Sequence, residues 1–334
     1  MSQISLEVLF SKLLWKSARA RKYVITNPYF GLPWSIQMEV TTRCNLRCKQ
    51  CMRSLDQTKL PASDMSLDLF HSIINQLRYP TQFLNLVGLG EPLLSPGIFS
   101  MIRYAKKHGL VVSLIDNFTL IDRNKSVALI NSGLDFLYAS FDSVSKNRFE
   151  KMRTGACFES VVKNVALFVK TRKEFKANRP VFFFKSTISQ SNLTEIPELV
   201  KLAETLEVDG INFGRMVGDE EARLNYELIF LNEGDFPRSR IFLDPCELSK
   251  SYQCDALEGC YVTFDGKVLP CGLMAEAVPR TQYSQLQLGD LRFNTLGSIW
   301  RSPTYRQFRK NLESGKYLPQ CAYCAGNKNL TKTH

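Results

Sequence analysis

The chain has 334 residues, 44% of them apolar and 22% charged, with a formal net charge of +11 and ten cysteines. This balance excludes an intrinsically disordered chain, and no uninterrupted apolar run approaches the ~20 residues that cross a bilayer. The positive charge permits anionic partners but selects none. Because the sequence contains no recognised nucleic-acid motif, we do not expect nucleic-acid binding.

The first 34 residues predict an amphipathic helical arm, in which Leu9, Leu13 and Trp15 lie among basic residues such as Lys12 and Lys16. The basic residues make this segment a poor secretory signal, so we expect a cytoplasmic protein whose thiols bind metals rather than form disulfides. We expect the arm, residues 1–34, to pack on the barrel or on a second subunit. A peripheral membrane contact through this helix is the alternative.

From residue 35 to about residue 216, short β-rich runs alternate with helical patterns, and residues 218–245 are irregular and charged. Several of the runs are almost continuously apolar, which is typical of parallel strands covered on both faces. Successive strand–helix units imply right-handed crossovers, so we predict an α/β fold, an open, partial (β/α)6 TIM-like barrel over 35–235. The expected strands are Ser35–Val40, Phe83–Gly88, Val111–Asp116, Asp135–Phe141, Val181–Ile188 and Gly210–Arg215.

Two helical patterns stand out, and a different pattern follows the barrel. Residues 67–77 and 196–206 each place their apolar side chains on one helix face, and Asn192, with Glu195 three residues on, is expected to cap the second helix. The region 240–334 is dense in cysteine and contains glycine, proline and short strand patterns. We expect it to form a small C-terminal domain that a metal stabilises.

Three cysteines, Cys44, Cys48 and Cys51, lie in one short loop directly after the first expected strand. A [4Fe–4S] cube normally takes four cysteines, so three leave one iron open, and an open metal position is where chemistry takes place. Barrel-type sheets carry their active sites at the C-terminal ends of the strands, where this loop is expected. The alternative is a structural zinc site, which needs four ligands, and no fourth cysteine or histidine lies nearby. The loop therefore indicates an enzyme.

The cysteine loop and the segment 88–92, Gly-Leu-Gly-Glu-Pro, together resemble the radical S-adenosylmethionine superfamily. The resemblance implies that S-adenosylmethionine chelates the open iron with its amino and carboxylate groups. It further implies that an electron from the reduced cluster cleaves the sulfonium, and that a 5′-deoxyadenosyl radical takes a hydrogen atom from the substrate. A flavodoxin or ferredoxin-type protein is the electron donor that the resemblance implies.

The resemblance also implies a cofactor site. Glycines allow the backbone to approach a ligand closely, and Glu91 supplies an anion for the methionyl ammonium. For the end of the fourth strand, at Ser140 and Asp142, the alternative is a cap for the following helix, and for Arg153 it is a solvated charge. Where the family often has a Thr-Asn-Gly turn, this chain has Phe118 in place of the glycine. The implied cofactor-binding residues are Gly88, Gly90, Glu91, Asn117, Ser140, Asp142 and Arg153.

The C-terminal cysteines form a second group, which resembles the auxiliary-cluster extension known as SPASM in its shortened, single-cluster form, called twitch. An Asp-Gly hairpin turn at 265–266, shortly before Cys271, fits this extension. The resemblance implies one auxiliary [4Fe–4S] cluster, and a four-cysteine zinc site with the same residues is the alternative. Cys260 and Cys246 remain substitutes for Cys254. The implied ligands are Cys254, Cys271, Cys321 and Cys324.

These features together predict a radical S-adenosylmethionine enzyme with two [4Fe–4S] clusters, in which the auxiliary cluster assists the net oxidation of a small molecule, as in a dehydrogenase-like oxidoreductase. No catalytic side chain is assignable beyond the clusters, and Lys185 and Arg215 are candidates only by their position on the fifth and sixth strands. Three alternatives remain open. They are a peptide-maturing radical enzyme, an enzyme that modifies tRNA or a cofactor precursor, and a non-enzymatic iron–sulfur electron carrier.

Overall fold

The computed structural model of the protein describes residues 31–56, 61–77, 81–215, 241–243 and 254–323. Most of the expected N-terminal arm therefore lies outside the described residues, as do Cys246 and Cys324. Among the helices that the structure describes, none is long and apolar enough to cross a membrane.

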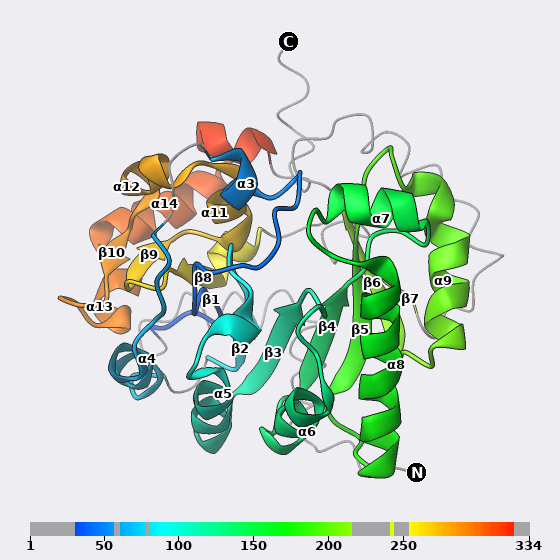
Figure 1. Ribbon diagram of the computed structural model, residues 1–334. Helices are drawn as coiled ribbons and strands as arrows, with labels where there is room; N and C mark the ends of the chain where they lie inside the picture. The colour runs from blue at the N-terminus through cyan, green and yellow to red at the C-terminus, as the bar shows by residue number, and fades with distance from the viewer. Residues whose placement is uncertain (1–30, 57–60, 78–80, 216–240, 244–253, 324–334) are drawn as a thin grey trace.

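One sheet organises the described part of the chain (Figure 1). Its strands are β1 (Ser35–Met38), β2 (Phe83–Leu86), β3 (Val111–Asp116), β4 (Phe136–Ser140), β5 (Val181–Ile188), β6 (Gly210–Arg215), β7 (Ile241–Leu243), β8 (Gly259–Val262), β9 (Lys267–Leu269) and β10 (Gly289–Asp290). They follow the order β10-β9-β8-β1-β2-β3-β4-β5-β6-β7. Strands β1 to β6 are parallel neighbours in chain order, which confirms the partial barrel predicted from the sequence.

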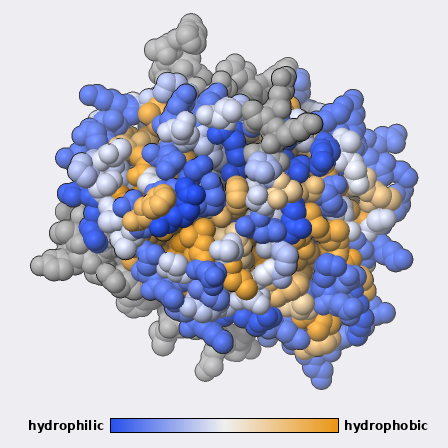
Figure 2. All heavy atoms as spheres, turned by 60° about the vertical axis from the view of Figure 1, so that its left-hand side comes forward, coloured by the Kyte–Doolittle hydropathy of each residue, from blue (hydrophilic) through white to orange (hydrophobic). Residues whose placement is uncertain are grey.

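Helices line the outer side of this curved sheet, and a second group surrounds the C-terminal strands (Figure 1). The barrel helices are α4 (Leu67–Ile74), α5 (Ile98–Lys107), α6 (Arg123–Asn131), α7 (Lys146–Met152), α8 (Phe158–Glu174) and α9 (Ile196–Thr205). The second group comprises α11 (Gly272–Ala277), α12 (Tyr283–Leu286), α13 (Leu296–Trp300) and α14 (Pro303–Glu313), and the short α3 (Met52–Leu55) follows the cysteine loop. Figure 2 shows polar atoms over much of one face of the molecule, with apolar atoms gathered across its middle.

The barrel strands divide their side chains between two faces. Side chains that point towards the helices are apolar and fully buried, as are Ile36, Leu84 and Val112. The alternate positions are only half-buried, and several of them are polar, among them Gln37 and Asn85. Because successive side chains of a strand point to opposite faces, the barrel has an apolar outer layer and a partly polar interior.

The C-terminal domain continues the barrel sheet. Strand β8 pairs in parallel with β1, which places Gln37 opposite Tyr261, and the chain then turns back into antiparallel β9. Gly266 adopts a φ of +87° at the expected Asp-Gly turn, a conformation that favours glycine. Tyr305 on α14 packs edge to face on Trp300 at 4.7 Å and donates to Gly259 O at 3.3 Å. These contacts join the C-terminal helices to β8 and hence to the barrel.

Two details differ from the expectations. Strand β7, at the start of the region 240–334, pairs in parallel with β6 of the barrel. The sequence does not predict this strand, because three residues are too few to show a pattern. Asn192 does not cap α9. Its side chain accepts from Ser189 N at 2.8 Å and donates to Asp142 O at 2.7 Å and to Thr187 O at 2.9 Å. Asn192 thereby ties together the segments that follow β4 and β5.

Candidate iron–sulfur and cofactor site

The cysteine loop, residues 44–51, leaves the C-terminal end of β1 and is held by backbone hydrogen bonds to the segment around the end of α7. Arg47 N donates to Thr154 O at 2.8 Å, and Lys49 N donates to Met152 O at 3.1 Å. Because α7 follows β4, the loops after two barrel strands meet at the rim where parallel barrels carry their chemistry. The protein itself therefore fixes the path of the cysteine loop.

The three thiols of this loop, Cys44, Cys48 and Cys51, are half-buried, and none of them forms a disulfide. Burial raises the pKa of Cys51 to about 11. Burial also raises the pKa of Cys48, and the positive charge of Arg153 opposes that shift. A bound metal centre reverses this preference, because coordination deprotonates a thiol. Three soft donors on one accessible loop fit an iron–sulfur cluster with one iron left open.

The segment 88–92 packs directly on the chain that leads into the cysteine loop. A Cβ atom on Gly90 would lie 2.0 Å from Thr41 O, and a Cβ atom on Gly88 would lie 2.6 Å from Glu39 Cβ. Neither position can therefore accept a side chain without moving its neighbours. Close packing explains both glycines, and their contact with S-adenosylmethionine stays a prediction.

Glu91 is buried, and both of its carboxylate oxygens accept backbone hydrogen bonds. Oε1 accepts from Leu93 N at 3.0 Å and Oε2 accepts from Asn117 N at 2.8 Å. Burial, together with the neighbouring Asp116, raises the pKa of Glu91 well above its ordinary value. Its own backbone N donates to Arg43 O at 2.7 Å. Glu91 thus joins the end of β3 to the approach of the cysteine loop, and its contact with the methionyl ammonium stays a prediction.

Asn117 reaches the cysteine loop, because its Nδ2 donates to Asn45 Oδ1 at 3.0 Å. The next residue, Phe118, has a φ of 60°, a left-handed conformation that glycine adopts without strain. The Phe118 ring is fully buried and stacks on Phe182 at a centroid distance of 5.0 Å. Core packing therefore offsets the backbone strain at Phe118, and the turn forms without the glycine that is usual in the family.

Asp142 and Arg153 form a buried ion pair, with Oδ2 and Nη2 2.6 Å apart. Burial lowers the pKa of Arg153, but the charges of Asp142 and Cys48 outweigh burial and leave it raised, which places this pair near the cysteine loop. Asp142 Oδ2 and Arg153 Nε have no aligned hydrogen-bond partner among the described residues. Ser140, the last residue of β4 and two residues before Asp142, is half-buried. These buried polar atoms fit the binding of a polar ligand such as S-adenosylmethionine.

Three cysteines of the C-terminal domain line a cavity of about 120 Å³, together with Gln37 and Asn85 of the barrel interior. Cys254 and Cys271 are half-buried. Cys260 is 3% exposed within β8, and burial raises its pKa to about 12. All three line the same cavity, so the preference for Cys254 over Cys260 as a ligand stays a prediction.

Cys321 lies in the short helix η7 (Pro319–Tyr323) and is 5% exposed. Helix η7 packs against α11, which begins directly after Cys271, so two of the implied ligands lie on adjoining elements. The Cys271 sulfur also accepts from Met274 N at 3.5 Å at the start of α11. The last implied ligand, Cys324, lies outside the described residues.

Polar side chains on neighbouring strands bond to one another in the barrel interior. Ser113 on β3 donates to Asn85 Oδ1 at 2.6 Å, and Lys185 on β5 donates to Asn212 on β6. Lys185, a candidate only by position in the sequence, is thus placed among polar groups of the barrel interior. For Arg215 the structure describes the backbone at the end of β6 but not the side chain.

Glu276 on α11 is a candidate functional residue that the sequence reasoning missed. Gln37 Nε2 donates to Glu276 Oε1 at 3.2 Å, so this carboxyl group of the C-terminal domain faces the barrel. Burial raises the pKa of Glu276 to about 7, although Gln37 and Lys185 oppose the shift. No motif marks Glu276, and its position shortly after Cys271 is the only signal that points to it.

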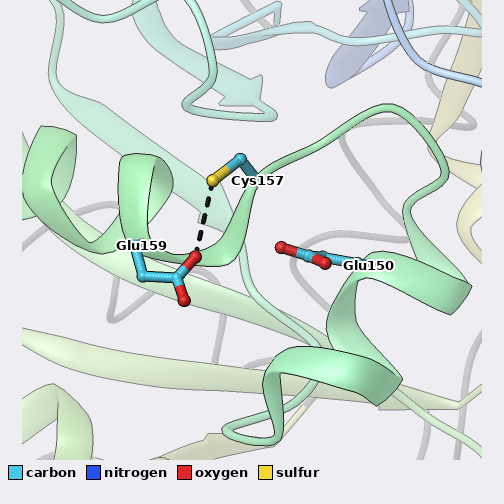
Figure 3. A group of neighbouring side chains, drawn as sticks. All are labelled: Glu150, Cys157 and Glu159. Carbon is cyan, nitrogen blue, oxygen red and sulfur yellow. Dashed lines mark hydrogen bonds between the residues drawn. The ribbon is translucent and has the colours of Figure 1, made fainter.

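A second group of candidate metal ligands lies on the surface, where side-chain ligand atoms of Glu150, Cys157 and Glu159 approach within 4.8 Å of one another (Figure 3). The Cys157 thiol donates to Glu159 at 3.4 Å, and Lys146 pairs with Glu159 at 2.8 Å. Phe158 N donates to Glu150 at 3.0 Å. These bonds account for the group as a local connection between α7 and α8.

Comparison with known proteins gives the family. The model of the radical SAM superfamily matches residues 38–190, and the model of SPASM, an iron–sulfur cluster-binding domain, matches residues 254–325. A tungsten-containing aldehyde ferredoxin oxidoreductase cofactor-modifying protein of Pyrococcus furiosus is 24% identical over 87% of this chain and 86% of that protein. An AdoMet-dependent heme synthase of Methanosarcina barkeri is 24% identical over 89% of each chain. A PqqA peptide cyclase of Gluconobacter oxydans is 25% identical over 83% of this chain and 79% of that protein.

Solved structures show the same fold. Streptococcus suis SuiB bound to S-adenosylmethionine superposes with a TM-score of 0.69 and 16% identity, over 99% of this chain and 80% of that chain. The structure of anSMEcpe with bound AdoMet superposes with a TM-score of 0.62 and 17% identity, over 88% of each chain. The two family models identify iron–sulfur clusters and S-adenosylmethionine as the cofactors of this protein. The chain belongs to the radical S-adenosylmethionine superfamily and carries a C-terminal SPASM domain.

Proposed function

We propose that this enzyme uses S-adenosylmethionine and an iron–sulfur cluster on Cys44, Cys48 and Cys51 to oxidise a small molecule in the barrel interior. The observation that carries the proposal is the placement of these three half-buried thiols on a loop that the protein holds at the barrel rim. When bound, the clusters and S-adenosylmethionine supply one-electron chemistry that takes a hydrogen atom and an electron from a substrate. The residues of the chain bind S-adenosylmethionine, orient the substrate and accept its proton.

The polar groups near the cysteine loop are suited to hold S-adenosylmethionine. Arg153 offers a cation for a carboxylate, and Asp142 offers an acceptor for an ammonium or a hydroxyl group. Both side chains are almost buried, with 12% and 0% of their surface exposed, so a ligand there is held away from water. The segment 88–92 offers further backbone groups beside the chain that leads into the cysteine loop, because Gly90 packs on Thr41 and Arg43.

The proton of the oxidised substrate needs an acceptor, and we assign this task to Glu276. An alcohol that becomes a ketone loses a hydrogen atom from carbon, an electron, and the proton of its hydroxyl group. A group whose pKa is near 7 accepts a proton efficiently at neutral pH, and burial raises the pKa of Glu276 to about 7. Gln37 orients the carboxyl group through its 3.2 Å hydrogen bond. The charge of Lys185 lowers the pKa of Glu276, and the charge of Glu39 raises it.

The position of the auxiliary cysteines supports a net oxidation. Cys254 and Cys271 line the same cavity as Gln37 and Asn85, whose side chains belong to the barrel interior. A cluster on these thiols would therefore lie next to a substrate in the barrel. We propose a flavodoxin or ferredoxin-type protein as the donor of electrons to the first cluster.

Peptide modification is the second candidate function. A PqqA peptide cyclase is among the relatives, with 25% identity over 83% of this chain. The two candidates make different demands on the barrel, because a peptide must enter it as an extended chain. Stimulation of 5′-deoxyadenosine release by a candidate peptide but not by small alcohols would favour peptide modification.

The proposed function is tested with protein reconstituted under anaerobic conditions. We expect about eight iron atoms per chain for two cubes, and about four if the C-terminal cysteines hold zinc. With dithionite and S-adenosylmethionine, the loaded protein should release 5′-deoxyadenosine, and a Cys44→Ala, Cys48→Ala, Cys51→Ala variant should not. Fully loaded protein that releases no 5′-deoxyadenosine would overturn the proposal.

A further inference from the structure

A buried ion pair joins the end of β1 to the SPASM domain. The Glu39 side chain has no exposed surface, and its Oε2 pairs with Nη2 of Arg280, whose side chain is 14% exposed. Arg280 begins the short helix η6 (Arg280–Gln282), which lies between α11 and α12 in the sequence. A buried carboxylate is costly unless it is paired and hydrogen-bonded, so Arg280 stabilises the Glu39 side chain in its buried position.

The same carboxylate contacts the segment 88–92. Glu39 Oε1 accepts from Leu89 N at 3.3 Å, and the backbone of Gly88 lies so close to Glu39 that a Cβ atom there would come within 2.6 Å. Glu39 Oε2 also accepts from Phe264 N at 3.4 Å, in the turn that connects β8 to β9. One side chain therefore holds together β1, the glycine segment and the SPASM hairpin.

Arg280 also contacts the chain just beyond the cysteine loop. Its backbone N donates to Asp56 Oδ2 at 2.9 Å, and Asp56 follows helix α3, which begins directly after Cys51. Its guanidinium lies 5.3 Å from the Phe264 ring centroid and 5.1 Å from the Tyr283 ring centroid. The guanidinium therefore lies between two aromatic rings while it pairs with Glu39.

We propose that Arg280 is a positioning residue for the S-adenosylmethionine site. Through its guanidinium and Glu39 it sets the position of Leu89 N and of the backbone from Gly88 to Gly90. The hydrogen bond from its backbone N to Asp56, which a substitution of the side chain leaves in place, holds the exit of the cysteine loop. This inference rests on the proposed function, because it takes the segment 88–92 as part of the cofactor site. The SPASM domain then serves the first site as well as its own cluster, and loss of the Arg280 guanidinium weakens S-adenosylmethionine binding.

The SPASM domain offers a matched control. Arg292 pairs with Asp290 at 2.6 Å and lies 5.3 Å from the Phe293 ring centroid, so it makes the same kinds of contact as Arg280. Asp290 and Phe293 both lie within the SPASM domain, and the Arg292 side chain is 47% exposed. Arg292→Gln therefore removes a similar ion pair without touching the barrel. Arg280→Gln removes both the charge and the planar set of N–H donors of the guanidinium. Arg280→Lys keeps the charge but loses the planar set of donors.

The experiment measures S-adenosylmethionine binding to reconstituted full-length protein by titration calorimetry, together with the electron paramagnetic resonance spectrum of the reduced cluster with and without S-adenosylmethionine. We expect Arg280→Gln to raise the dissociation constant about tenfold or more and to change the spectral response, and Arg292→Gln to stay within about twofold. If Arg280→Gln does not fold, Arg280→Lys decides, with a smaller rise in the same direction.

Two outcomes separate this inference from the proposed function. If the parent protein binds S-adenosylmethionine and the folded, iron-loaded Arg280 variants bind it as tightly, the inference is wrong and the proposed function stands. If the parent protein itself does not bind S-adenosylmethionine, the proposed function fails. A lower melting temperature with an unchanged dissociation constant shows a purely structural role and overturns the inference.

Discussion

Gln37 on β1 and Glu276 on α11 meet in the barrel interior, where Gln37 Nε2 donates to Glu276 Oε1 at 3.2 Å. One residue belongs to the first barrel strand and the other to the SPASM domain. Their contact places an ionisable group beside the strands that line the barrel. Burial of that group has a measurable cost, which the pH dependence of stability should reveal.

Glu276→Gln should stabilise the protein at alkaline pH. Burial raises the pKa of Glu276 from its ordinary 4.5 to about 7, so the folded chain binds this proton more tightly than the unfolded chain. The carboxyl group therefore contributes stability below pH 4.5 that is lost as the pH rises to about 7. We expect the variant to exceed the parent by up to about 3 kcal/mol at pH 8 and by about 1 kcal/mol or less at pH 5.

Thermal unfolding of both proteins at pH 5, 6.5 and 8 checks this prediction. The control is Glu198→Gln, which removes a carboxyl group on the exposed side of α9. An equal difference between Glu276→Gln and the parent at all three pH values would show that Glu276 ionises in the folded protein as it does in the unfolded one.

Phe118 should tolerate glycine better than alanine. Its φ of 60° is strained for any residue with a Cβ atom, and its buried ring packs on Phe182 and Phe168. Phe118→Ala loses the ring and keeps the strain, at a cost of about 3–5 kcal/mol. Phe118→Gly loses the ring and relieves the strain, so its free energy of unfolding should exceed that of the alanine variant by up to about 1 kcal/mol. Denaturant unfolding of the two variants measures this difference. If Phe118→Gly is less stable than Phe118→Ala, the backbone at residue 118 is not strained.

The barrel could be predicted from the sequence because each strand carries its own pattern. Strand β3 and strand β5 have the predicted bounds, Val111–Asp116 and Val181–Ile188. The cysteine motifs are equally local, since ligands close in sequence must be close in space. Strand β7 could not be found in this way, because three residues are too few to show an alternation.

The contacts between the two domains could not be predicted. Glu39 and Arg280 are 241 residues apart, and Gln37 and Glu276 are 239 apart, so no local pattern connects them. Asn192 shows the same limit on a smaller scale, because its position predicts a helix cap. Its side chain donates instead to the carbonyl oxygens of Asp142 and Thr187, outside the helix.

Gly90→Ala should disturb the cysteine loop. The new methyl group would lie 2.0 Å from Thr41 O, a backbone atom that can move only with the chain leading into the loop. We expect a loss of about 1–3 kcal/mol in stability and less iron in the first site. Gly97→Ala is the control, because its methyl group meets the flexible end of Leu67 at 2.9 Å. Iron analysis and thermal unfolding of both variants provide the test, and a Gly90→Ala protein with parental iron content would refute the expectation.

The identity of the auxiliary ligand can be decided by iron content. Cys254 and Cys260 both line the cavity beside Cys271, but Cys260 lies within β8 and is almost fully buried. A ligand must give up its proton and turn towards the metal, and burial, which raises the pKa of Cys260 to about 12, opposes this. We therefore expect Cys254→Ala to reduce the iron content from about eight to about four atoms per chain, while Cys260→Ala keeps about eight.

The exposed Cys157 supplies the control for loss of a thiol that binds no cluster, so Cys157→Ala should also keep the full iron content. Cys260→Ala leaves a small cavity in β8 and should lower the melting temperature while the iron content is maintained. Loss of iron in Cys260→Ala but not in Cys254→Ala would show that Cys260, and not Cys254, is the cluster ligand. In that case the ligand would lie on β8, the strand that pairs directly with β1.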